Sequence, residues 1–80
     1  MKNRNYYEKA FASYPDLVTT EQARIMLGGV GINTIYYLLH NSRLEHYHIR
    51  GTFLIPKAAL IGYILGDHYN MFKEKLKHQV

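Results

Sequence analysis

The stretch MLGGVGINTIYYLL, from Met26 to Leu39, decides how the rest of the chain folds. It places three glycines within four positions and follows them at once with an apolar, tyrosine-bearing helical pattern. A glycine cluster can cradle a phosphate group, but such a loop follows a strand and has a Gly-x-Gly-x-x-Gly or Lys-Ser/Thr ending. Here a helical pattern precedes the glycines and neither ending is present. The cluster therefore predicts a tight turn between two helices, where positive φ angles are needed.

The segment before this turn, VTTEQARIML (18–27), has the spacing of a short amphipathic helix. Thr19 or Thr20 can cap its N-terminus, and from Thr19 the side chain of Gln22 stands where a capping box is completed. The glycines that follow end the helix. Its apolar side chains recur at helical spacing, at Ala23, Met26 and Leu27.

The segment after the turn, GINTIYYLLHNSR (31–43), predicts a second helix that is capped by Gly31 or Asn33. Tyr36 neighbours the inward stripe and is expected at the edge of the core. The inward stripe itself is formed by Ile35, Leu38 and Leu39. The residues expected to face outward are Asn33, Thr34, Tyr37, His40 and Asn41.

A small β-hairpin is predicted for LEHYHIRGTFLIP (44–56), in which apolar and polar residues alternate with one slip of phase. Residues 50–52 are expected at its tip and residues 53–55 in its return strand. Pro56 ends that strand because proline cannot continue a ladder, although it suits the first turn of a helix.

The remaining residues, 57–80, have a helical pattern to the end of the sequence or nearly so. Gly62 and Gly66 each weaken such a helix by about 1 kcal/mol relative to alanine. Its broad apolar face is formed by Leu60, Ile61, Ile64 and Leu65. A further stripe either packs back onto the domain or contacts a partner, through Tyr69, Phe72 and Leu76.

This order of elements is that of a winged helix-turn-helix, so the expected fold class is mainly α with a small β-hairpin. The chain from Val18 to about Ile64 resembles the small excisionase-type, MerR-like DNA-binding domains. In that family a Thr-led acidic helix precedes a glycine turn, a T-[VI]-Y recognition helix and a hairpin that ends in aromatic-x-Ile-Pro. The residues that carry the resemblance are Thr19, Glu21, Ala23, Leu27, Gly28, Thr34, Ile35, Tyr36, Leu39, Arg43, Leu44, Gly51, Phe53, Ile55, Pro56 and Leu60.

The chain also departs from the pattern of that family. Its turn is one residue longer, and Arg24 stands where a second small alanine is common. Ile32 and Asn33 occupy positions that are often basic, and Arg50 replaces a second glycine of the wing. The first and last dozen residues lie outside the resemblance.

The composition limits the chain to one domain, because 80 residues cannot form a second core. The absence of cysteine excludes disulfides and thiol nucleophiles, and it fits a reducing cytoplasm. No apolar run approaches the roughly 20 residues of a membrane span, and no signal peptide is recognised. We expect an N-terminal arm or short helix at 1–15, a winged helix-turn-helix domain at 16–66 and a C-terminal helical extension at 67–80.

The net charge of +4 and the pI of about 9.4 suggest a polyanionic partner. The major groove of DNA admits one helix, whose N-terminal residues reach the base edges. Base contacts are therefore expected from the start of the second helix, and backbone contacts from its next turn, from the arginine that follows it and from the hairpin. The expected DNA-binding residues are Asn33, Thr34, Tyr37, His40, Arg43, His48, Arg50 and Thr52.

Catalysis is not expected, because the six carboxylates are scattered and the serines in turns have no evident base. His46 and His48 share one face of a strand and His40 can join them, but no cysteine or carboxylate on that face completes a metal set. No catalytic residue, cofactor or metal ion is therefore predicted.

The resemblance implies a double-stranded DNA-binding protein that bends DNA and directs the excision of a mobile element beside an integrase or another recombinase. A transcriptional or plasmid-transfer regulator of the same fold is an alternative. A protein-binding adaptor that acts through its C-terminal helix is another. In each case we expect a cytoplasmic protein with no membrane contact, either monomeric or weakly self-associating on DNA.

Overall fold

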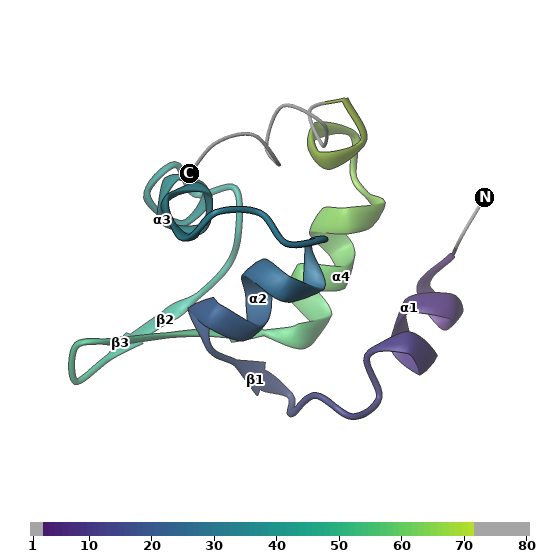
Figure 1. The fold of residues 1–80 in the computed structure, drawn as a ribbon, viewed down its shortest axis with the longest axis horizontal. Helices are drawn as coiled ribbons and strands as arrows, with labels where there is room; N and C mark the ends of the chain where they lie inside the picture. The colour runs from purple at the N-terminus through teal and green to yellow at the C-terminus, as the bar shows by residue number, and fades with distance from the viewer. Residues whose placement is uncertain (1–2, 72–80) are drawn as a thin grey trace.

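The computed structural model describes residues 3–71 and begins with a short helix, α1 (Arg4–Ala10) (Figure 1). Asn3 caps this helix, because its side-chain oxygen accepts a hydrogen bond from the amide of Tyr6 at 3.0 Å. The helix packs on α4 (Lys57–Leu65). Aromatic side chains in and after α1 lie partly buried against the core, at Tyr7, Phe11 and Tyr14.

A two-residue strand, β1 (Leu17–Val18), is an element that the sequence did not predict. It pairs antiparallel with β3 (Thr52–Pro56), so that its two residues lie opposite Pro56 and Ile55. The side chain of Val18 is completely buried. A strand this short has no alternation of its own, and only its pairing with a distant segment defines it.

The predicted first helix forms as α2 (Thr20–Met26), and its capping box is confirmed. Thr19 Oγ1 accepts a hydrogen bond from the amide of Gln22 at 3.1 Å, and Gln22 Oε1 accepts one from the amide of Thr19 at 3.0 Å. The predicted apolar face is buried, at Ala23, Met26 and Leu27.

The glycine cluster forms the turn between α2 and α3 (Ile32–His40), as predicted. Gly28 and Gly29 adopt φ angles of 94° and 85°, in the region that favours glycine. Their amides donate to carbonyls in the last turns of α2 at 3.0 and 2.9 Å, which closes a Schellman motif. Arg24 also donates from Nη1 to the carbonyl of Val30 at 3.2 Å, and this bond holds the turn from the side.

The predicted hairpin consists of β2 (Tyr47–Ile49) and β3, and the strand order in the sheet is β1-β3-β2. Arg50 and Gly51 form the tip, with φ angles of 51° and 78° that are typical of a type I′ turn. Thr52 was expected at the tip but is the first residue of β3, opposite Ile49. The tip needs only two residues because Arg50 itself adopts a positive φ.

The last predicted helix is interrupted, so a helix that runs unbroken toward the end of the sequence is wrong. α4 ends at Leu65, and Gly66 has an extended conformation with φ −85° and ψ 169°. Residues 67–71 are helical again after this break. Leu65 was expected on the buried face but is 37% exposed. Two members of the predicted C-terminal stripe lie outside the described residues, Phe72 and Leu76.

α2 and α4 pack against β3, α3 packs on α2, and these elements share one core. Within residues 3–71, the structure is a small mixed α/β domain with five helical segments and a three-stranded antiparallel sheet, larger than the predicted hairpin. No helix in this range is long and apolar enough to cross a membrane. The predicted division of the chain near residues 15 and 66 stays a prediction. Fully buried core side chains are Leu27, Val30, Ile35, Leu38, Leu44, Ile55 and Leu60.

Candidate nucleic-acid interface

The outward face of α3 is accessible along its whole length. Asn33 in the first turn and His40 in the last are exposed, and Tyr37 between them is 48% exposed. The buried face opposite them contains the predicted stripe, which consists of Ile35, Leu38 and Leu39. This side of the helix is therefore available to a partner.

Thr34 was predicted to contact a base, but this prediction is wrong. Its side chain is 1% exposed and belongs to the core. Residues four apart lie above one another on a helix, so Thr34 shares the inward face with Leu38. Its hydroxyl made the residue look like part of the polar face. A buried side chain at this position supports the packing of α3 and does not reach a base edge.

The ring of Phe53 in β3 joins α3 to the hairpin. Tyr36 and His40 of α3 approach it edge-on, with ring centroids at 5.9 and 6.4 Å. From the other side His46 lies at 5.5 Å and His48 stacks on it at 4.4 Å, with 17° between the ring planes. Two predicted site residues, His40 and His48, are thus brought together by an aromatic ring that sequence reasoning did not assign to the site.

Arg43 is exposed just beyond the C-terminal end of α3. Its amide donates to the carbonyl of Leu38 at 2.9 Å, and the amide of Ser42 donates to that of Leu39 at 3.2 Å. Ser42 has a φ of 56°, so these bonds form a Schellman motif without glycine. The backbone direction at Arg43 is consequently fixed by the end of the helix.

The side chain of Arg43 lies near a tyrosine–histidine pair. Tyr63 Oη and His68 Nδ1 are 2.7 Å apart. Burial raises the pKa of the Tyr63 hydroxyl to about 12, an increase that the charge of Arg43 partly opposes. Burial also lowers the pKa of the His68 imidazole, and the charge of Arg43 lowers it further. Arg43 therefore adds positive charge beside phenolic and imidazole groups where α3 ends.

The hairpin tip presents Arg50 to the surroundings, and both residues of the turn are exposed. Thr52 is exposed too, although it lies in the strand. Figure 1 shows α3 and the hairpin on the same side of the molecule, away from α1. The predicted site residues other than Thr34 are all exposed, but Thr52 alternates with Phe53 along β3 and therefore points to the face of the sheet away from α3.

The fixed positive charge of this side lies beside α3 and not on it. Residues 32–40 contain no lysine or arginine, so the cations are Arg43 and Arg50. Histidines from α3 and the hairpin lie around Phe53. Across residues 3–71, no group of three or more His, Cys, Asp or Glu side chains is placed to hold a metal ion.

Comparisons of the chain with protein-family models, with curated proteins and with solved structures found no match. The family resemblance of the sequence stays an expectation.

Proposed function

We propose that this protein is a winged helix-turn-helix protein that binds double-stranded DNA. α3 enters the major groove, Asn33 contacts a base, and Tyr37 and His40 contact the backbone. Asparagine can form two hydrogen bonds with adenine, so it is a suitable side chain for reading a base edge. The hairpin serves as the wing, and Arg50 contacts the adjacent minor groove or the backbone.

One observation carries this proposal. An exposed helix with polar residues along its outward face has one exposed arginine just beyond its C-terminal end, and a second exposed arginine lies at the tip of the hairpin. Phosphate contacts from arginine position a protein on duplex DNA, and base contacts give the specificity. The Phe53 ring and the Schellman motif at Ser42 fix the hairpin and Arg43 relative to α3, so these contacts are preorganised.

The biological role that we propose is that of an excisionase-like accessory factor, which bends DNA near the recombinase of a mobile element. Such a role implies action in the cytoplasm, as a monomer or with weak self-association on DNA. A transcriptional or plasmid-transfer regulator would use the same surface. A gel assay with circularly permuted DNA fragments separates these roles in part, because bending should change mobility with the position of the binding site.

Salt-dependent DNA binding tests the interface itself. Fluorescence anisotropy with duplex DNA should show affinity that falls steeply with salt. Arg43→Ala and Arg50→Ala should each lower the slope of log K against log salt by about 0.9, the value for one lost phosphate contact. Lys9→Ala on α1 is the matched control, because it removes one exposed positive charge from the other side of the fold.

Two results would count against this interface. If the control weakens binding as much as the arginine variants, the effect comes from net charge and not from the proposed surface. If the anisotropy measurement shows no binding of duplex DNA at low salt, the protein-binding adaptor function gains support instead.

A further inference from the structure

The face of the sheet that points away from α3 is apolar and exposed. Phe53 and Ile55 point toward the helices, so the alternating neighbours in β3 and their partners in β1 and β2 point outward. Three large outward side chains are strongly exposed: Leu17 at 41%, Tyr47 at 49% and Ile49 at 50%. Contiguous apolar surface on a small domain marks an interaction site.

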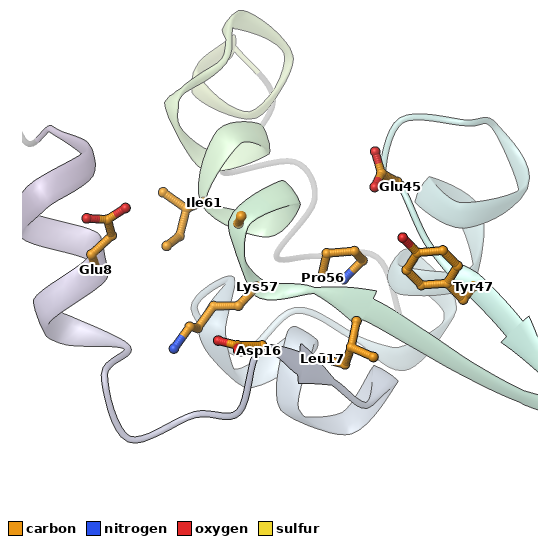
Figure 2. Close-up of a pocket in the computed structure, with 9 residues that line it drawn as sticks. Glu8, Asp16, Leu17, Glu45, Tyr47, Pro56, Lys57 and Ile61 are labelled. Atoms are coloured by element: carbon orange, nitrogen blue, oxygen red, sulfur yellow. The ribbon is translucent and has the colours of Figure 1, made fainter.

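This face continues into a cavity of about 510 Å³ between α1, β1 and the start of α4 (Figure 2). Glu8 stands on one side of the cavity and Glu45 on the other, while Asp16 lies next to β1. The apolar part of the lining is formed by Leu17, Pro56, Ala58 and Ile61. The cavity is therefore an apolar hollow with a carboxylate rim.

Within residues 3–71, none of the rim carboxylates forms an ion pair. Lys57 also lines the cavity, but its Nζ donates to the carbonyls of Phe11 at 3.3 Å and Tyr14 at 2.8 Å. Among residues 3–71 the ion pair between Arg24 and Glu21, at 3.0 Å, is the only one. Three carboxylates and one ammonium group leave the lining with a net charge of −2. Such a cavity suits a segment with ammonium groups on apolar stems.

The end of this chain has the complementary chemistry. Residues 72–80, FKEKLKHQV, contain three lysines and one glutamate, a side-chain charge of +2 when histidine is neutral. Phe72 and Leu76 supply two large apolar side chains next to the lysines. The segment thus matches the cavity in charge and in apolar character.

We propose that residues 72–80 of one copy dock in the carboxylate-rimmed cavity of a second copy. The segment of the same copy is less well placed, because residues 67–71 follow the C-terminal end of α4 and the cavity lies at its start. Donor and acceptor surfaces differ, so the contact is head-to-tail and can be repeated from copy to copy. It uses neither α3 nor the hairpin tip, and it goes beyond DNA binding without depending on it.

Sedimentation velocity of the full chain, without DNA and in low salt, tests the docking. The wild type should self-associate as its concentration rises to about 1 mM, where weak complexes are populated. Glu8→Gln with Glu45→Gln should raise the dissociation constant about fivefold to tenfold, the effect of two partly exposed ion pairs. Glu21→Gln with Asp67→Asn changes the charge equally and should leave association unchanged. Circular dichroism confirms that each variant is folded.

A mixing experiment identifies the occupant. A third variant, Lys73→Gln with Lys77→Gln, should associate as poorly as the cavity variant. An equimolar mixture of the two should form a heterodimer, because one contributes an intact cavity and the other an intact segment. Monomers at every concentration, an equal loss in the control pair, or a mixture that stays monomeric would overturn the proposal. The first result is the one that docking within a single copy would give.

Discussion

Thr34 illustrates how far a single residue can be placed from sequence. Its hydroxyl and its position near the start of α3 suggested the polar face, yet the side chain is buried beside Leu38. The neighbouring Asn33 is exposed, as predicted. Helical spacing fixes which residues share a face, but the width of the buried arc depends on how closely α2 approaches. That distance is a property of the packed molecule and not of the sequence pattern.

Substitutions at these two neighbours should separate stability from recognition. Thr34→Ala removes buried atoms, so it should lower the free energy of unfolding by about 1 to 2 kcal/mol and leave DNA affinity of the folded protein nearly unchanged. Asn33→Ala should leave stability nearly unchanged and relax the base preference at one position in a selection from random duplexes. Urea denaturation and the selection measure the two effects. The opposite pattern would mean that Thr34 contacts DNA after all.

His68 should make the stability depend on pH. The pKa of its imidazole is lowered in the folded state, so the unfolded chain binds more protons near the ordinary value of 6.5. The contribution of His68 is therefore fully present above that pH and is lost as the pH falls below it. His68→Gln should reduce the loss of stability between pH 7.5 and 5.5 in urea denaturation. An unchanged pH dependence would show that His68 is not perturbed in the folded protein.

At the scale of elements, local signals were reliable wherever a side chain or a backbone angle acts on its own neighbours. The capping box at Thr19, the positive φ angles of Gly28 and Gly29 and the hairpin tip at Gly51 are all of this kind. Elements defined by distant contacts were not predictable: β1 exists only through its pairing with β3. The low helix propensity of glycine indicated a weak point at Gly66, where the helix does break. Propensity alone, however, does not decide where a helix ends.

Two glycine substitutions should change the stability of the protein in opposite directions. Gly29→Ala puts a Cβ on a residue with a φ of 85°, where no neighbour obstructs it, so backbone strain alone should lower stability by about 1 to 2 kcal/mol. Gly62→Ala lies inside α4, and its new Cβ would meet only the flexible end of Arg4 at 3.4 Å. It should raise stability by up to about 1 kcal/mol. Thermal unfolding compares them, and a destabilised Gly62→Ala would show that α1 and α4 pack too tightly there.

At the scale of the whole molecule, one small domain with a single core presents two different surfaces. One side combines the polar face of α3 with Arg43 and Arg50, and the far side of the sheet combines apolar residues with a carboxylate rim. The sequence predicted most residues of the first surface, because they lie on a helix and a hairpin with clear patterns. It did not predict the position of Phe53 at the junction of α3 and the hairpin, nor the second surface. Both arise from contacts between segments that are far apart in the chain.

The most direct test of DNA binding is an NMR titration of the isotope-labelled full chain with a duplex at low salt, following the backbone amide signals. We expect the largest shifts at Asn33, Tyr37 and His40, at Arg43, and at the hairpin tip, with little change along the outward face of the sheet. If the amide signals of these residues do not shift at saturating concentrations of duplex, the proposed DNA interface is contradicted. Shifts confined to the cavity and the outward face of the sheet would contradict it as well.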